Sequence, residues 1–263
     1  MSSTLRRFAI VAGLILFALF LTQTMHAATP AHPARPQAGA PETLLLEAAN
    51  RDRAAAGLPQ LQWDMSLAAA ARQHALRMAQ INMISHQFPG EPPLQQRALQ
   101  SGARFSVIAE NVAEGPSVLG LHTQWMNSPP HRANLLAHDL NAVGIAIVQS
   151  SGMLFAVEDF SAAVPVLNLD AQELQVGSLL SSRGLRLVSA TPEARRTCDM
   201  DRGWAGQRPL YVLRYETGDL NRLPDELDQR LQGGKFKGAA VGACDAGGSG
   251  GAFARFRIAI LLF

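Results

Sequence analysis

The stretch 108–136 constrains the fold of this chain more than any other part, because its polar residues are flanked by apolar ones. Its sequence is IAENVAEGPSVLGLHTQWMNSPPHRANLL. Glu110 lies among apolar neighbours, and an isolated buried carboxylate is very costly, so the fold must supply a partner. We expect the polar side chains of the stretch to converge on one cleft: Glu110, Asn111, Trp125, Ser128, His131, Arg132 and Asn134.

Ser128-Pro129-Pro130 predicts the start of a helix. Serine can cap a first turn, and proline at the first helical position loses no hydrogen bond that the helix needs. His131 would then lie in the first turn. We therefore expect the Ser128 hydroxyl to be engaged as a helix cap and not to act as a nucleophile.

The N-terminus has the order of parts of an export signal. Arg6 and Arg7 precede the apolar run 8–21, and small residues follow at Ala27 and Ala28. The run is shorter than the roughly 20 residues that a membrane-spanning helix prefers. Residues 1–27 are therefore predicted to be a signal peptide of a secreted or periplasmic protein, and only an uncleaved segment would attach the chain to a membrane. Residues 28–41, rich in proline, are predicted to be an extended linker.

The charge of the chain argues against one class of binding partner, and its cysteine content predicts a disulfide. The formal net charge is +2 and no basic run occurs, so nucleic acid is not an expected partner. Cys198 and Cys244 are the only cysteines, and in an exported chain a lone pair predicts one disulfide. Such a bridge would stabilise the fold by about 4 kcal/mol on the chain-entropy model. The alternative is two buried free thiols.

Hydrophobic spacing predicts an α+β domain over residues 42–164. Helices are expected at 41–57, 65–82, 92–101 and 116–127, and the strands 142–149 and 153–161 form a hairpin on an antiparallel sheet. His74 lies on the buried stripe of the second helix, which is typical of a core histidine with a hydrogen-bond partner. His86 follows the end of that helix, where a side chain is freer to line a site.

The succession of motifs in this region resembles the bacterial branch of the CAP superfamily of cysteine-rich secretory proteins, antigens and pathogenesis-related proteins. The resemblance implies an α-β-α sandwich with a shallow cleft. In eukaryotic members two histidines and two glutamates line that cleft and can bind a divalent metal, and members are linked to sterols, fatty acids or protein partners. The motifs are Asn50-x-x-Arg53, Leu58-Pro59-x-Leu61-x-Trp63-Asp64, Ser85-His86, Glu110-Asn111-Val112-Ala113, Trp125-Met126-Asn127-Ser128-Pro129-Pro130-His131-Arg132-x-Asn134 and Val143-Gly144-Ile145.

Only some of the cleft residues of eukaryotic members have a counterpart in this sequence. His86 matches the first histidine and Glu110 the first glutamate, but the second glutamate falls on Ser128 and the second histidine on Phe155. The family's glutamine on the last strand falls on Glu158. Bacterial members carry the histidine of the Ser-Pro-x-His-Arg motif instead, here His131. The resemblance thus implies these cleft residues: His86, Glu110, Ser128, His131 and Glu158.

Two interpretations of this cluster stay open. His86, Glu110 and His131 could form an open three-ligand zinc site that leaves a position for water. Alternatively, the three side chains form a hydrogen-bonded structural cluster in which Glu110 holds His86 in one tautomer.

Residues 165–263 are predicted to form a second, smaller α+β domain with no chemistry that we can name. A helix is expected at 169–182, with Asp170 and Glu173 in a capping-box spacing. The segment Gly247–Gly251 is glycine-rich and lacks the lysine of a phosphate-binding loop, so it predicts a hairpin tip. The remaining elements are strands at 185–188, 210–215, 236–243 and 253–263 and a helix at 224–231.

Two classes of function fit this sequence. One is an exported binding module whose cleft takes a small apolar ligand, a peptide, or a protein or other component of the cell envelope. The other is a metal-dependent hydrolase that uses His86, Glu110 and His131. The chain has no nucleophile, base and orienting group at a recognisable spacing and no His-Glu-x-x-His motif, which favours the non-catalytic module.

Overall fold

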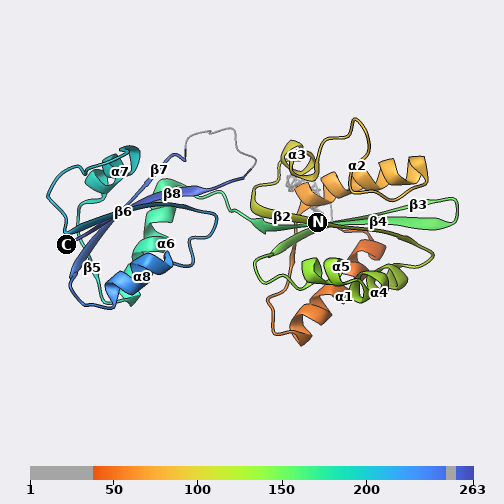
Figure 1. Cartoon of the computed structure of the whole chain (residues 1–263), viewed down its shortest axis with the longest axis horizontal. Coiled ribbons are helices and arrows are strands. Elements are labelled where there is room, and N and C mark those ends of the chain that lie inside the picture. The colour runs from red at the N-terminus through yellow and green to blue at the C-terminus, as the bar shows by residue number, and fades with distance from the viewer. Residues whose placement is uncertain (1–37, 247–252) are drawn as a thin grey trace, which may run out of the picture. The chain divides into compact units, whose positions relative to one another are not determined.

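The computed structural model describes residues 38–246 and 253–263 and contains two four-stranded sheets within them (Figure 1). The predicted signal peptide, most of the predicted linker and the glycine-rich segment Gly247–Gly251 lie outside the described residues. Among the helices of the described part, none combines the length and apolar character needed to cross a membrane. Each sheet is formed by strands of one region of the described chain, and the division into two α+β domains stays a prediction.

The first sheet has the strand order β1-β3-β4-β2, with β3 and β4 at its centre. Its strands β2, β4 and β3 pair antiparallel, but β1 runs parallel to β3. The expectation of a purely antiparallel sheet is therefore wrong in this detail, because a two-residue strand leaves no periodicity to read. The elements are α1 (Ala40–Ala55), β1 (Gln62–Trp63), α2 (Met65–Ile81), α3 (Leu94–Gln100), β2 (Phe105–Gly115), α4 (Val118–Asn127), α5 (Pro129–Leu135), β3 (Ala142–Ser150) and β4 (Met153–Ala163).

Helices cover both faces of this sheet, which gives the predicted α-β-α sandwich (Figure 1). Because successive side chains of a strand point to opposite faces, β4 contributes to two cores. Phe155 and Val157 pack with residues of α2. Ala156 and Phe160 pack with residues of α1, α4 and α5. Helix α2 begins directly after Asp64, whose carboxylate accepts hydrogen bonds from the N–H groups of the first turn.

Arg53 of α1 holds the two segments of chain that lead into the parallel strands β1 and β3. Its guanidinium is fully buried and donates to the carbonyls of Pro59 (2.8 Å), Leu135 (3.0 Å), Ala137 (2.8 Å) and Leu140 (2.9 Å). Burial lowers the pKa of Arg53 from its ordinary value. Since a buried charge needs hydrogen-bond partners, these carbonyls specify where the loops after α1 and α5 run.

The second sheet has the order β5-β7-β8-β6, with β7 and β8 at its centre. Cys198 and Cys244 form the predicted disulfide between α7 and β7. Helix α7 has no counterpart in the sequence-based prediction, because its run of charged residues gives only a short apolar stripe. The elements are α6 (Leu169–Ser182), β5 (Arg186–Leu187), α7 (Thr191–Asp199), β6 (Tyr211–Thr217), α8 (Asp225–Leu231), β7 (Gly238–Cys244) and β8 (Phe256–Leu262).

The start of α6 differs from the predicted capping box. Asn168 caps the helix by accepting from the N–H of Ala171 at 2.8 Å. Glu173 instead forms an ion pair with Arg195 at 2.6 Å and accepts the N–H of Ala243. The tertiary partners of Glu173 are stronger than a local cap, because the guanidinium brings opposite charge to a carboxylate that is mostly buried.

Candidate functional site

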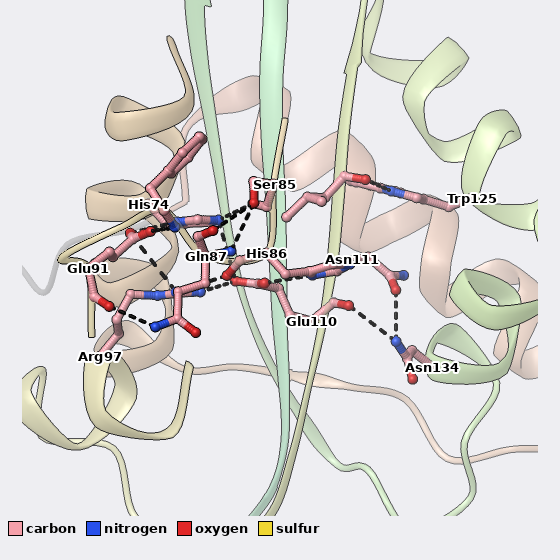
Figure 2. A network of polar contacts seen from close by, with 12 residues as sticks. His74, Ser85, His86, Gln87, Glu91, Arg97, Glu110, Asn111, Trp125 and Asn134 are labelled. Atoms are coloured by element: carbon pink, nitrogen blue, oxygen red, sulfur yellow. Dashed lines mark hydrogen bonds and ion pairs between the residues drawn. The ribbon is translucent and has the colours of Figure 1, made fainter. Parts of the chain in front are cut away.

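Glu110 lies on β2, the strand that forms one edge of the first sheet, and faces the side covered by α2 and α3. Two side chains form hydrogen bonds with its carboxylate, and Nε2 of His74 lies 4.0 Å from Oε2 (Figure 2). Nδ1 of His86 donates to Oε1 at 2.8 Å, and Arg97 donates through Nη2 to Oε2. Glu110 and Arg97 are both buried, whereas 61% of the His86 side chain is exposed. The predicted partner of Glu110 is thus present, and an unpredicted cation stands beside it.

Arg97 joins this ion pair to the loop that carries His86. Its Nη1 donates to the backbone carbonyl of His86 at 3.1 Å and to that of Pro92 at 3.3 Å. The Glu110 hydrogen bond raises the pKa of His86, and desolvation and the Arg97 charge oppose this shift. The imidazole is therefore an exposed, hydrogen-bond-donating group that is held in position from the protein interior.

A second histidine, on α2, contacts the same loop from the protein interior. His74 is fully buried on α2, as predicted, with Nδ1 2.7 Å from Glu91 Oε1 and Nε2 2.7 Å from the carbonyl oxygen of Ser85. The other oxygen of Glu91 accepts the N–H of Phe88 at 3.0 Å. These contacts tie the loop 85–91 to α2, so the orientation of His86 depends on His74 and Glu91 (Figure 2).

Helix α5 begins after Ser128 as predicted, but the Ser128 hydroxyl makes no cap hydrogen bond, so the expectation that it is engaged as a cap is wrong. The hydroxyl lies 2.8 Å from Nδ1 of His131 instead. Pro129 and Pro130 supply no N–H groups at the first two helical positions, which leaves the hydroxyl free to bond the imidazole. Burial and the neighbouring charge of His86 lower the pKa of His131. A neutral imidazole bonded to a hydroxyl follows from this geometry.

His86 and His131 approach β2 from opposite sides of the sheet. His86 bonds Glu110, whereas the next residue, Asn111, points to the other face and donates to the carbonyl of His131 at 3.1 Å. Asn134 of α5 donates to the Asn111 side chain at 2.9 Å and thereby fixes it (Figure 2). The charge of His86 contributes to the lowered pKa of His131, and no hydrogen bond between the two side chains is found among the described residues.

The sequence profile of the cysteine-rich secretory protein family, CAP, matches residues 46–160. We refer to the region that contains these matched residues as the CAP domain. The uncharacterized protein YkwD of Bacillus subtilis is 30% identical over 115 residues, which are 43% of this chain and 44% of YkwD. The chain therefore spans less than half the length of that relative.

Two solved structures are similar to the CAP domain. An outer surface protein of Borrelia burgdorferi is 21% identical with a TM-score of 0.44, over 47% of this chain and 92% of that one. An extracellular protein containing an SCP domain from Bacillus anthracis is 27% identical with a TM-score of 0.43, over 45% of this chain and 39% of that one.

The side chains of the CAP domain do not fit a three-ligand metal site. In residues 38–246 and 253–263, no three His, Cys, Asp or Glu side chains are grouped as ligands. The Glu110 carboxylate is already neutralised by Arg97, and a zinc ion would have to displace that buried guanidinium. His86 and Glu110 form the hydrogen bond that the second interpretation expects, whereas His131 bonds Ser128. The structural cluster is therefore present only as the His86–Glu110 pair, without the side chain of His131.

Glu158 does not line the cleft of the CAP domain, contrary to expectation. Glu158 is fully buried on the central strand β4, and its cross-strand neighbour is Asn111. Burial raises the pKa of Glu158 to about 8, and Asn111 opposes the shift. The next residue, Asp159, is also fully buried, beside Glu110, and burial raises its pKa well above the ordinary value. Within the described residues, neither carboxyl group has a partner that satisfies hydrogen-bond geometry.

Sequence reasoning misses Arg97 and Asp159 as members of the cluster. Arg97 belongs to a short helix that looks like a surface helix, and nothing local marks it as buried. Asp159 could be found, because an acid follows another acid in the apolar run of a strand that the hairpin pattern already predicts. Two adjacent acids on opposite faces of a central strand must both be buried, whichever way the strand turns.

Proposed function

We propose that the CAP domain is a non-catalytic binding module of an exported protein and that His86 is its principal contact with the ligand. The observation that carries this proposal is an exposed imidazole fixed on a buried Glu110–Arg97 ion pair. A side chain with 61% of its surface exposed gains little stability from such support, so the support serves a group that acts outward. The N-terminal order of arginines, apolar run and small residues supports export.

The surroundings of His86 favour an amphipathic ligand. Met83 and Ile84 precede His86, and both side chains are exposed. Glu110 engages Nδ1 and raises the pKa of His86, which leaves Nε2 to donate to an acceptor or an anionic group. A small apolar ligand with one acceptor group, a peptide, or a component of the cell envelope has this combination of surfaces.

Native mass spectrometry of the exported protein tests the proposal. We expect the full chain to retain a non-covalent adduct, and we expect His86→Ala to lose it. His138→Ala is the matched control, because His138 is exposed in a loop away from Glu110. An adduct that is unchanged in His86→Ala would contradict the role of His86. Zinc added to the same samples measures the metal alternative, which requires one-to-one binding that is lost in both His86→Ala and His131→Ala.

A second candidate function is serine-dependent hydrolysis, because Ser128 Oγ lies 2.8 Å from an imidazole whose pKa is lowered. Against this candidate, no acid orients His131 within the described residues. A fluorophosphonate probe decides between the two functions. Labelling that is lost in Ser128→Ala and in His131→Ala would favour the hydrolase, and absence of labelling would leave the binding module.

A further inference from the structure

We infer that residues 169–263 are a second, shortened copy of the CAP-type sandwich, although the family profile covers only residues 46–160. The two sheets have the same order when their strands are numbered along the chain: β1-β3-β4-β2 and β5-β7-β8-β6. The strand directions also agree. The short first strand is parallel to the third, and the third and second are each antiparallel to the fourth.

The helices occupy the same places in both units (Figure 1). In each unit a first helix precedes the short parallel strand, and a second helix follows that strand directly: α1 and α2 in the first unit, α6 and α7 in the second. Helix α2 packs on one face of its sheet, and α7 does the same. The opposite face is covered by α1, α4 and α5 in the first unit and by α6 and α8 in the second.

The connection after the first helix is also the same. Gly57 and Gly184 end α1 and α6 in the left-handed conformation, with φ of 70° and 84°. The N–H of the following leucine then bonds the carbonyl five residues earlier: Leu58 to Arg53 at 2.9 Å and Leu185 to Leu180 at 3.2 Å. A shared helix end aims the chain into the short strand in the same way.

One glycine in each sheet permits an unusually close helix. Gly144 of β3 and Gly242 of β7 end the same tripeptide, Ala-Val-Gly. A Cβ at Gly144 would lie 2.0 Å from the backbone nitrogen of Ala68 in α2, and a Cβ at Gly242 would lie 2.1 Å from the backbone carbon of Ala194 in α7. Because backbone cannot yield as a flexible side chain can, both positions require glycine for the same reason.

This correspondence gives the disulfide a counterpart in the first unit. The Cβ at Gly144 would meet the peptide bond between Leu67 and Ala68, and the Cβ at Gly242 would meet the bond between Ala194 and Arg195. Cys198, four residues after Ala194, therefore matches Ala71, four residues after Leu67, and Cys244 matches Ala146, each two residues after its glycine. Ala71 and Ala146 lie in one apolar cluster between α2 and the sheet. The bridge therefore joins the helix and the strand at the place where the first unit packs two alanines.

The copy has lost the polar cluster. Glu110 lies opposite Asp159 in the strand pairing of the first sheet, and the matching pair in the second sheet is Arg214 and Ala259. Arg214 donates to the carbonyls of Thr197 and Gly203, so it serves the local structure. The binding site that we propose is consequently confined to the first unit, and the inference about the copy does not depend on it.

Engineered cysteines test the correspondence. The full chain with Ala71→Cys and Ala146→Cys should form a second disulfide, because the native Cys198–Cys244 pair has a Cα–Cα distance of 5.7 Å in the equivalent place. The control pairs Ala75→Cys with Ala146→Cys. One helical turn moves the cysteine by about 6 Å, beyond disulfide reach. Peptide mapping without reductant should show the 71–146 bridge at least about tenfold more than the 75–146 bridge, a ratio that corresponds to one decade in equilibrium constant.

Free thiols at 71 and 146, in protein whose native bridge is intact, would overturn the inference, as would equal yields for both pairs. If the double-cysteine chain does not fold, Cys198→Ala with Cys244→Ala provides the reciprocal test. It transplants the alanine pair of the first unit and should leave the region 169–263 folded at a lower Tm. Complete proteolysis of that region, with the first unit intact, would overturn the inference.

Discussion

At the scale of single residues, the site depends on which charges are buried together. Glu110 is stabilised by Arg97 and directs His86 outward, whereas Glu158 and Asp159 are buried on β4 without a cation of their own in the described part. Acids that cannot be ionised cheaply change their pKa instead. A charged pair at the edge of the sheet thus lies near two buried acids whose pKa values are raised by burial.

Replacing Glu110 with Gln should lower the pKa of His86. The carboxylate favours the imidazolium, and the neutral amide does not. A titration of the histidine resonances by NMR measures the shift, and His138 serves as the internal reference. If His86 has the same pKa in Glu110→Gln and in wild type, the contact with Glu110 is absent in solution.

Glu158 should make the protein less stable as the pH rises. Its pKa is raised from an ordinary 4.5 to about 8, so the folded state holds a proton that the unfolded state releases between these values. Stability is therefore lost through this window and is not regained above it. Glu158→Gln should remove the effect and stabilise the chain by up to about 5 kcal/mol at alkaline pH, with little change below the ordinary pKa.

Urea unfolding at about pH 4 and about pH 9 measures this difference. Glu114→Gln is the matched control, because Glu114 is an exposed acid on β2. If wild type and Glu158→Gln lose stability equally with pH, Glu158 is ionised in the folded protein and our assignment is wrong.

At the scale of elements, the fold depends on how closely α2 approaches β3. The helix lies against Gly144, and the alanines of α2 fill the layer between them. On the side that α2 covers, β2 receives Arg97 from α3 and His86 from the loop before it. The position of α2 therefore sets the position of the loop that carries His86, through His74.

Gly144→Ala should destabilise the first unit by about 3 kcal/mol or more, because the new methyl group meets backbone that must move as a whole. Gly177→Ala is the control. Its Cβ would meet only the tip of the Leu187 side chain, at 2.9 Å, and alanine favours the helix by up to about 1 kcal/mol. Chemical denaturation compares the two variants. Equal stabilities would mean that α2 is not held against Gly144.

At the scale of the whole molecule, each sheet is complete within its own region. The first unit has strands β1 to β4 and both helical layers before residue 164. If the second unit is a copy of the same sandwich, both units should be capable of independent folding, and only the first would carry the binding residues.

A chain truncated at residue 164 should therefore remain soluble and folded. Its far-UV circular dichroism should show helix and strand, and its unfolding should be cooperative. The histidine resonances of the full chain should reappear in the truncated one. Expression only as an aggregate would contradict separate folding and would point to an interface that the two units share.

The sequence alone determined the features that depend on neighbours in the chain. The start of α2, the hairpin of β3 and β4 and the CAP motifs are local patterns, and the disulfide follows from a lone cysteine pair in a chain that is predicted to be exported. Only the tertiary structure decided which distant residues meet. In the folded protein Arg97 pairs with Glu110, the Ser128 hydroxyl hydrogen-bonds the His131 imidazole, and Glu158 is buried in the core. The tertiary structure also revealed α7 and the repeated strand order, because packing between distant segments, and not local periodicity, determines both.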